Sequence, residues 1–425
     1  METIAIKPCG PLDARIRPPG SKSITNRALI CAALADGPST LAGALRSEDT
    51  EVMIEALRRL GVRVEQDTAA QTLRVEGCSG RFPGETAELY LANSGTSIRF
   101  LTAAVCVGQG VFRLDGSPRM RQRPIGDLLD ALTALGAELH SENGNGCPPV
   151  IVRAAGLAGG KATVSGAISS QFLSGLLMAT PYARASCELV VEGELVSKPY
   201  IAMTLAVMRS FGAAVDHSDF SRFRVAAGQR YHGGRFEIEP DASAASYFFA
   251  AAAIAGGAVT VEGLTESSLQ GDVGFCKCLQ QMGCAVQYDQ NGITVHGAPL
   301  RGVDVDMGDI SDTVQTLAAA ALFAEGPTTI RGVAHIRHKE TDRIGDLARE
   351  LRKFGAEVDE REDGLRIVPR ALSGAEIDTY NDHRMAMSLA LVGLRVPGVV
   401  IRDPRCTEKT YPDFFADLER LTVQR

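Results

Sequence analysis

A pattern of about seventy residues occurs six times along the chain, and it restricts the possible folds more than any other feature. In each copy a short run typical of a β-strand ends at one marker residue, which is Gly five times and Asp once. The intervals between successive markers are 73, 77, 70, 69 and 71 residues. Such regular spacing indicates one structural unit used repeatedly. The markers are Gly43, Gly116, Gly193, Gly263, Gly332 and Asp403.

Two kinds of helix recur around this strand. The first precedes it, is rich in Ala and is apolar on nearly all sides, which is typical of a helix buried inside a domain. The second follows it, is amphipathic, and in the first five copies ends at a Gly before another strand pattern. With three such units per domain, the chain is predicted to form two similar α/β domains of about 210 residues each.

The starts of the buried helices carry the residue types that cap helix N-termini. If the repeats are symmetric, these N-termini gather at one face of each domain. Each N-terminus has unpaired N–H groups and a partial positive charge, so we expect the converging ends to bind anions. The starts lie at Ser21, Asn93, Ser169, Asp241, Ser311 and Asn381.

The composition of the chain restricts the kinds of partner that such a site can bind. A net charge of −7 and a pI near 5.6 argue against a broad nucleic-acid-binding surface. The first residues do not resemble a secretory signal, and the longest apolar run is too short to span a bilayer. Ten cysteines in 425 residues are too sparse for a disulfide scaffold. We therefore expect a cytoplasmic protein with neither nucleic acid nor membrane as a partner.

Basic side chains occur near several of the predicted helix starts. Lys22 and Arg27 are found at the first one. Cations at a helix N-terminus oppose the helix dipole, but a bound anion turns this penalty into attraction. Taken singly, each is also explained as a solvated surface charge; their recurrence in an acidic protein favours a binding role. The other basic candidates are Arg99, Arg123, Lys339, Arg343, Arg384 and Lys409.

Polar and acidic candidates complete the pattern. Hydroxyl and amide groups at the third helix start suit a phosphate or a polyol, although capping and turn formation explain them equally well. Asp312 is either an N-cap or a catalyst, and Glu340 is either a catalyst or a partner in local ion pairs. The polar candidates are Ser23, Ser169, Ser170, Gln171, Ser197 and Tyr200.

With these residues assembled, the sequence closely resembles the 5-enolpyruvylshikimate-3-phosphate (EPSP) synthase family over essentially its whole length. The family fold has two domains, each made of three βαβαββ units with buried helices and outer sheets (an inside-out α/β barrel), joined by two crossover strands. The resemblance rests on PGSKSITNRAL, the segment 93–99, RPIGDLLDAL, SSQFLSGLLM, SKPYI, DASAASYFFAAAAI, KETDRI, NDHRMAMSLAL and CTEKTYPDFF.

The resemblance also implies where the domains divide. Residues 21–239 would form the domain on the shikimate 3-phosphate side, and residues 1–20 with 240–425 the other, with a hinge near 20–21 and 239–240. The family reaction moves the enolpyruvyl group of phosphoenolpyruvate to the 5-hydroxyl of shikimate 3-phosphate and releases phosphate. We expect binding of the first substrate to draw the two domains together.

The family's functional residues carry over position by position. The resemblance places around shikimate 3-phosphate the residues Ser23, Arg27, Ser169, Ser170, Gln171, Ser197, Tyr200, Asp312 and Lys339. It places around phosphoenolpyruvate the residues Lys22, Gly95, Arg123, Gln171, Arg343, Arg384 and Lys409.

The expected chemistry is addition followed by elimination through a tetrahedral intermediate. Our hypothesis is that Asp312 accepts the hydroxyl proton, while Glu340, aided by Lys22, handles the proton at C3 of phosphoenolpyruvate. Fixed Lys and Arg side chains neutralise the substrate charges, so we expect no metal and no cofactor.

Two positions depart from the common family pattern. Phe100 stands where many members have Pro, which is expected to affect the second buried helix and therefore sensitivity to glyphosate, the family's inhibitor at the phosphoenolpyruvate site. His335 stands where some members have an Asn that contacts the shikimate phosphate, so it is expected to change one contact without removing activity.

Two alternatives belong to different classes. One is the related enolpyruvyl transferase that acts on UDP-N-acetylglucosamine, whose N-terminal segment typically reads Lys-Asn-Ala where this chain has Ser21-Lys22-Ser23. The other is a non-catalytic anion-binding protein of the same fold, against which the presence of Lys22, Asp312 and Glu340 together argues. We expect a monomer, because no long apolar surface stripe is evident.

Overall fold

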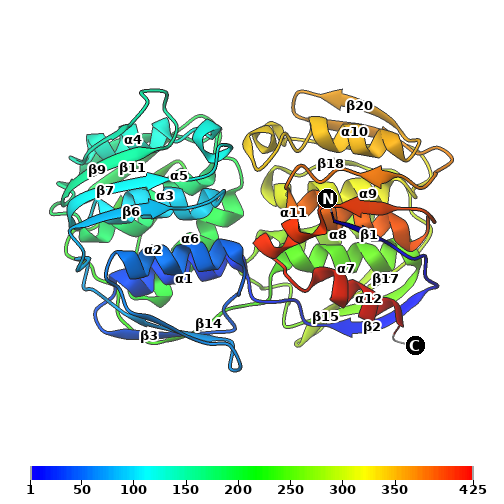
Figure 1. The fold of residues 1–425 in the computed structure, drawn as a ribbon, viewed down its shortest axis with the longest axis horizontal. Coiled ribbons are helices and arrows are strands. Elements are labelled where there is room, and N and C mark those ends of the chain that lie inside the picture. The colour runs from blue at the N-terminus through cyan, green and yellow to red at the C-terminus, as the bar shows by residue number, and fades with distance from the viewer. Residues whose placement is uncertain (1, 424–425) are drawn as a thin grey trace. The chain divides into compact units, whose positions relative to one another are not determined.

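The chain folds into two compact units, which a computed structural model describes for residues 2–423 (Figure 1). Unit 1 contains Met1–Pro19 and Glu239–Arg425, and unit 2 contains Gly20–Ile238. Each unit has its own continuous apolar core. The units are therefore described separately.

Unit 2 contains three copies of one motif, each a four-stranded sheet with one buried and one outer helix. The buried helices are α1 (Lys22–Leu34), α3 (Gly95–Val105) and α5 (Ser170–Ala179); the outer helices are α2 (Glu48–Arg59), α4 (Gly126–Ala134) and α6 (Lys198–Ser210). The sheets, in strand order, are β14 (Arg235–Glu237), β3 (Pro38–Ala42), β5 (Thr72–Glu76), β4 (Val64–Asp67); β6 (Thr86–Tyr90), β7 (Gln109–Asp115), β9 (Val150–Ala155), β8 (Glu138–Ser141); and β10 (Gly160–Ser165), β11 (Cys187–Glu192), β13 (Arg222–Val225), β12 (Asp216–Ser218).

Unit 1 repeats the arrangement with small variations. Its buried helices are α7 (Ala242–Ala255), α9 (Val314–Ala321) and α11 (His383–Ala390); its outer helices are α8 (Phe275–Gln281), α10 (Gly345–Lys353) and α12 (Phe414–Val423). The sheets, in strand order, are β16 (Ala285–Tyr288), β17 (Gly292–His296), β15 (Gly257–Glu262), β2 (Leu12–Ile16); β18 (Asp304–Asp306), β19 (Thr328–Arg331), β21 (Gly364–Val368), β20 (Glu357–Arg361); and β1 (Thr3–Ala5), β23 (Val400–Arg402), β22 (Glu376–Ile377).

The strand pairing within the four-stranded sheets follows one rule. A first strand lies parallel to the strand after the buried helix, as β6 does to β7, and an antiparallel pair completes the sheet. Three of the described strands leave the sequential order, and one of them is β1, which pairs with β23 in the three-stranded sheet. β2 precedes α1 in the chain but pairs with β15 of unit 1, and β14 precedes α7 but pairs with β3 of unit 2. In Figure 1 the blue strand β2 accordingly lies beside the green β15.

The buried helices pack closely because their side chains are small. In unit 1, hydroxyl groups join all three: Ser246 of α7 lies 3.1 Å from Thr316 of α9, which lies 3.2 Å from Ser388 of α11. Each hydroxyl comes from the first turns of its helix, so the three N-termini lie at the same end of the unit. The predicted buried helices are confirmed, and the α/β fold class with them.

The marker residues and the helix ends behave as the repeat predicts. The Gly that ends each of the first five amphipathic helices has positive φ, from 86° at Gly61 to 111° at Gly283, where L-residues are strained. Asp403, the one marker that is not Gly, has φ +47°, the same left-handed region as four of the Gly markers. Asp tolerates this region better than most residues, which explains the exception.

One helix start differs from the prediction. The segment Ser311–Thr313, predicted to open the fifth buried helix, belongs to the 3₁₀ turn η4 (Gly308–Thr313), and α9 begins only at Val314. No side-chain cap bond forms there, so Asp312 is not an N-cap. Its carboxylate is instead held by basic side chains from neighbouring segments.

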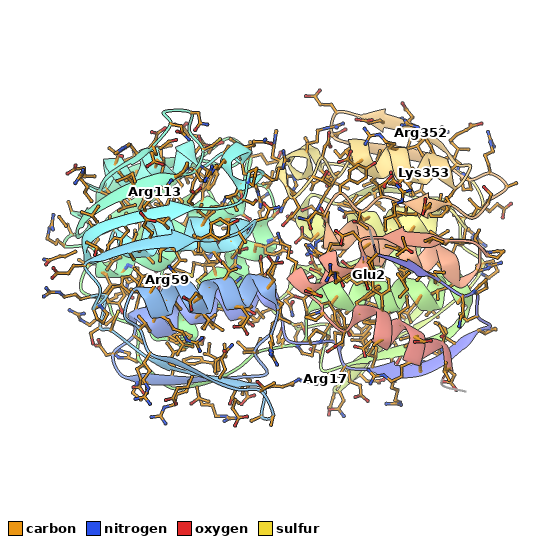
Figure 2. All side chains as sticks on the ribbon, in the orientation of Figure 1. Glu2, Arg17, Arg59, Arg113, Arg352 and Lys353 are labelled. Carbon is orange, nitrogen blue, oxygen red and sulfur yellow. The ribbon has the colours of Figure 1, made fainter. Side chains whose placement is uncertain are left out.

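The outside of both units is rich in solvated charge. Figure 2 shows this for side chains such as Arg59 on α2 and Arg352 on α10, both exposed. Among the described residues no helix is both long enough and apolar enough to cross a membrane.

Candidate functional site

The three buried helices of unit 2 begin at serines that cap them. Ser21 accepts a hydrogen bond from Ile24 N at 3.3 Å, Ser94 from Ser97 N at 3.2 Å, and Ser169 from Gln171 N at 3.3 Å. The caps confirm these starts to within a residue. Because each cap uses one N–H group, other N–H groups of the first turn remain outside the helical hydrogen-bond pattern.

Arg123 lies against the N-terminus of α3. Its guanidinium is 3% exposed and donates to the backbone oxygen of Asn93 at 3.1 Å and to the Asn93 side chain at 3.3 Å. It also occupies the space that a side chain at Gly95 would need, because a Cβ built there lies 2.4 Å from Arg123 Nη2. The sequence predicts that Arg123 opens the amphipathic helix of the second repeat, but in the structure α4 begins three residues later, at Gly126. A buried cation at a helix N-terminus is an arrangement that an anion stabilises.

Gln171 is held at the start of α5 by a residue whose role the sequence analysis left open. Arg99 of α3 donates to Gln171 Oε1 at 2.6 Å and lies over the ring of Phe172, 5.0 Å from its centroid. The Gln171 amide nitrogen in turn donates to Thr96 Oγ1 at 3.3 Å. Arg99 therefore orients the Gln171 amide, with its oxygen toward Arg99 and its nitrogen toward Thr96.

Arg27 is more deeply placed than its predicted ligand role suggests. It is 1% exposed and donates to Thr204 Oγ1 at 2.7 Å, Ser174 Oγ at 3.2 Å, and the backbone oxygens of Ser23 (3.0 Å) and Tyr200 (3.3 Å). Burial lowers the pKa of Arg27 to about 10, which is still high enough for the side chain to be charged at neutral pH. It thus joins α1, α5 and α6.

Phe100, the first departure from the family pattern, packs on that arginine. Its ring centroid is 5.1 Å from the Arg27 guanidinium carbon, and the residue is 1% exposed. α3 runs through this position as a continuous helix. A large aromatic side chain is therefore accommodated in the core as a cation–π partner.

Other predicted unit 2 residues lie at the starts of α1 and α6. Lys22, the first residue of α1, forms an ion pair of 3.7 Å with the buried Asp49 of α2, a partner that the sequence analysis did not identify. Ser197 precedes α6 in the left-handed conformation, with φ +56°, and its carbonyl accepts from Tyr200 N at 3.0 Å. Backbone strain of this kind is often found at binding sites.

In unit 1 the predicted residues form one ion-pair network around Asp312. Its Oδ2 accepts from Arg384 at 2.8 Å, and its Oδ1 lies 3.2 Å from Arg343 Nη1 and 3.7 Å from Lys339 Nζ. These basic groups come from α11 and from the segment before α10. The structure therefore assembles side chains that are 27 to 72 residues apart in sequence.

Arg343 is the centre of this network and is 1% exposed, not part of an exposed helix start. Two of its nitrogens contact Asp382 at 2.7 and 3.1 Å, and Nη2 lies 2.9 Å from Glu340, which also pairs with Lys409 at 3.1 Å. Burial lowers the pKa of Arg343, but the charges of Asp382, Glu340 and Asp312 outweigh burial and raise it above the usual value.

The formal charges of the network leave it ready for an anion. Four cations, Lys339, Arg343, Arg384 and Lys409, face three carboxylates, which leaves a charge of +1. His335, the second departure from the family pattern, lies in the same network, with Nε2 2.9 Å from Ser311 Oγ. Burial and the charge of Lys339 lower the pKa of His335 to about 4, so it is neutral at pH 7 and adds no charge.

The comparisons with known proteins agree with this geometry. The model of one protein family, described as EPSP synthase (3-phosphoshikimate 1-carboxyvinyltransferase), matches residues 6–418. The chain belongs to the EPSP synthase family. A 3-phosphoshikimate 1-carboxyvinyltransferase from Nostoc punctiforme is 48% identical over 426 residues, which cover 100% of both chains. A chloroplastic one from Arabidopsis thaliana is 48% identical over 99% of this chain and 84% of its own length.

Solved structures of the EPSP synthase family have the same fold. An EPSP synthase from Acinetobacter baumannii superposes with a TM-score of 0.84 and 26% identity, covering 99% of this chain and 98% of that one. The chain is thus an enolpyruvyl transferase of the shikimate pathway, which moves the enolpyruvyl group of phosphoenolpyruvate to the 5-hydroxyl of shikimate 3-phosphate. This reading is favoured over the UDP-N-acetylglucosamine enzyme.

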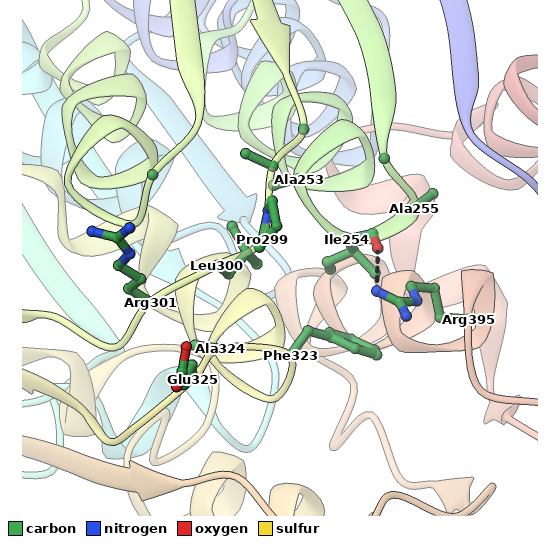
Figure 3. Close-up of a pocket in the computed structure, with 14 residues that line it drawn as sticks. Ala253, Ile254, Ala255, Pro299, Leu300, Arg301, Phe323, Ala324, Glu325 and Arg395 are labelled. Atoms are coloured by element: carbon green, nitrogen blue, oxygen red, sulfur yellow. Dashed lines mark hydrogen bonds between the residues drawn. The ribbon is translucent and has the colours of Figure 1, made fainter.

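A cavity of about 980 Å³ in this EPSP synthase family member lies away from the residues described above (Figure 3). The cavity lies at the C-terminal end of α7, and the N-terminal end of α7 lies beside the Asp312 network. A helix of 14 residues is about 21 Å long, so this length separates the cavity from the network. Figure 3 shows Arg395 aimed at the carbonyl of Ile254, to which it donates at 3.4 Å, and it also lies 5.5 Å from the Phe323 ring. A cation at a helix C-terminus stabilises the helix, which is sufficient reason for this arginine.

No group of three or more His, Cys, Asp or Glu side chains within residues 2–423 is arranged to hold a metal ion. Two residues that the sequence analysis did not assign pair with predicted site residues: Asp49 with Lys22, and Asp382 with Arg343. Asp382 had a signal, because it caps α11 by accepting from Arg384 N at 2.9 Å and stands within a family motif. Asp49 had none beyond its place in a helix.

Proposed function

We propose that this chain binds the two substrates of enolpyruvyl transfer through the residues that the family resemblance implies. Shikimate 3-phosphate is held by hydroxyl, amide and cationic groups, and its unit 2 contacts are made by the starts of α1, α5 and α6. Its ligands are Ser23, Arg27, Ser169, Ser170, Gln171, Ser197, Tyr200, Asp312 and Lys339. The ligands of phosphoenolpyruvate are Lys22, Gly95, Arg123, Gln171, Arg343, Arg384 and Lys409.

The assignment is supported by the concentration of buried cations. Arg123, Arg343, Arg384 and Lys409 are each less than 9% exposed, and cations are buried only where negative charge compensates them. Phosphate and carboxylate groups match the forked geometry of arginine. Asp312 and Glu340, released in part from their ion pairs by the incoming anions, become available to move protons.

Each step then has a proton carrier. Asp312 takes the proton of the 5-hydroxyl as its oxygen bonds to C2 of phosphoenolpyruvate. Glu340, which is protonated before this step and is aided by Lys22, supplies the proton that C3 gains. In the second step C3 returns that proton to Glu340 while the C2–O bond to phosphate breaks. Asp312 gives the hydroxyl proton to the departing phosphate, which leaves the enol ether, free phosphate and both carboxyl groups as they began.

A direct test is phosphate release from phosphoenolpyruvate by the purified protein. We expect release with shikimate 3-phosphate and none without it, or with UDP-N-acetylglucosamine in its place. Absence of release with both cognate substrates would indicate a protein that binds anions without transferring the enolpyruvyl group.

Replacing Gly95 by Ala is expected to weaken phosphoenolpyruvate binding. The new Cβ would lie 2.4 Å from Arg123 Nη2, so the guanidinium must move away from the start of α3. Loss of one charge-assisted hydrogen bond of about 1.5–3 kcal/mol corresponds to a KM for phosphoenolpyruvate raised about 10- to 100-fold.

Gly126→Ala is the matched control, because Gly126 is also the first residue of its helix and its Cβ would meet only atoms at 3.8 Å. It should leave the KM unchanged. An unchanged KM in Gly95→Ala would remove Arg123 from the phosphoenolpyruvate site.

We also propose that the protein is a cytoplasmic monomer. The large apolar side chains exposed among the described residues, such as Tyr90 and Leu269, are few and scattered over different elements. Light scattering after gel filtration should give a mass near 45.1 kDa, and a dimer mass would contradict the proposal.

A further inference from the structure

Asp272 is a buried carboxyl group that the mechanism above does not use. It lies in the 3₁₀ turn η3 (Gly271–Gly274) and is 4% exposed. Its Oδ2 accepts a hydrogen bond from the hydroxyl of Ser243, at the start of α7. η3 packs directly against η4, the turn that carries Asp312. A buried carboxyl is unfavourable unless its surroundings compensate for lost hydration, so its position calls for a reason.

Asp272 and Asp312 influence each other electrostatically. Burial and the charge of Asp312 raise the pKa of Asp272 to about 6, although the Ser243 hydrogen bond and Arg384 act in the opposite direction. The interaction between two titrating groups is mutual, so a charge on Asp272 equally favours a proton on Asp312. The remaining groups that face the pair are Asp241, His335, Lys339, Arg343 and Arg384.

The cations around Asp312 weaken it as a base, and the charge of Asp272 counteracts this effect. Three cations lie within 3.7 Å of the Asp312 oxygens and stabilise its ionised form. The more a carboxylate is stabilised, the less readily it takes a proton from a hydroxyl group. A second negative charge, on the turn that packs against η4, opposes the effect of the three cations.

We propose that Asp272 is a positioning residue, whose buried carboxylate offsets the cations around Asp312 and preserves the ability of Asp312 to accept the hydroxyl proton. This inference rests on the proposed role of Asp312 as the base. Ser243 supports it by holding the Asp272 carboxylate in its ionised form at the start of α7.

The test is the pH dependence of kcat/KM in Asp272→Asn, which keeps the shape and removes the charge. The acidic limb should move to lower pH by about one unit, equivalent to a tenfold change in proton affinity, and the plateau should fall about tenfold because the base is weaker. An acidic limb at its original pH, in a folded variant, would overturn the proposal.

Glu350→Gln is the matched control. Glu350 is 0% exposed in α10 of the same unit and accepts from Tyr380 Oη at 2.6 Å and Asp378 N at 3.0 Å, neither of which pairs with Asp312. Loss of the Glu350 carboxylate destabilises unit 1 but does not remove the charge of Asp272 near Asp312. If both variants moved the acidic limb equally, the effect would be one of general stability and the proposal would be wrong.

A second measurement separates this inference from the proposed catalytic role. In a ¹³C NMR titration of Asp carboxyl groups, the Asp312 signal, identified by its loss in Asp312→Asn, should titrate at lower pH in Asp272→Asn. An unmoved midpoint overturns the inference. A shifted midpoint together with full turnover in Asp312→Asn would overturn the role of Asp312 and leave the coupling standing. Should Asp272→Asn fail to fold, Ser243→Ala must give a smaller shift in the same direction, and no shift overturns the proposal.

Discussion

Asp312→Asn is expected to lower kcat by about 10²- to 10⁴-fold, the range that one general base contributes. The amide keeps the size of the side chain but cannot take a proton. Because the substitution raises the formal charge of the network from +1 to +2, binding of anionic substrates should not weaken. Steady-state kinetics with both substrates varied will measure the two effects separately.

Asp304→Asn provides the comparison for this variant. Asp304 is an exposed carboxylate of β18 in the same unit, paired with Arg331 at 2.9 Å, and its loss should change neither kcat nor KM. A variant at Asp312 with raised KM and normal kcat would show that the residue binds substrate without carrying the proton.

Arg343→Met should produce the largest loss of stability. The substitution leaves Asp382, which is 0% exposed, together with Glu340 and Asp312 without their shared cation. Breaking a buried ion pair from one side costs about 3–5 kcal/mol. In a unit of this size that lowers the midpoint of thermal unfolding by roughly 6–20 °C. Differential scanning calorimetry will show whether the unit 1 transition shifts while that of unit 2 stays in place.

Arg331→Met is the control for stability. Arg331 makes two ion pairs, with Asp304 and Asp306, but its side chain is 52% exposed. Exposed pairs contribute about 0–1 kcal/mol, so the midpoint should move little. Equal shifts in both variants would mean that the buried network does not hold unit 1 together.

The repeat allowed the sequence to predict much of the fold. Six buried helices, five amphipathic helices ending at Gly and the strands after them follow from local patterns that act within a few residues. The start of α9 was the exception. Ser311 and Asp312 are residue types that cap helices. In the structure the Asp312 carboxylate pairs with Arg384, and the segment forms a 3₁₀ turn instead of a capped helix start.

The candidate site was predictable where its residues carry a local signal. Lys22, Arg123 and Arg343 stand at or near helix starts, where a cation is unfavourable unless an anion is present. Asp49 and Asp272 have no such signal, because an acid within a helix or turn is ordinary in sequence. Arg99 had the signal, but only the structure shows that it holds Gln171. The roles of Asp49 and Asp272 are likewise revealed by their partners, Lys22 and Ser243.

The sequence by itself determined the repeating unit, the buried character of its helices and the residue types at their N-termini, because periodicity and capping depend on neighbours along the chain. The tertiary structure alone decided that β2 and β14 pair outside their own repeats, that Arg343 is enclosed by three carboxylates, and that the turn of Asp272 packs against the turn of Asp312. These contacts join residues far apart in the chain, and their energies depend on distance and burial, which no local pattern encodes.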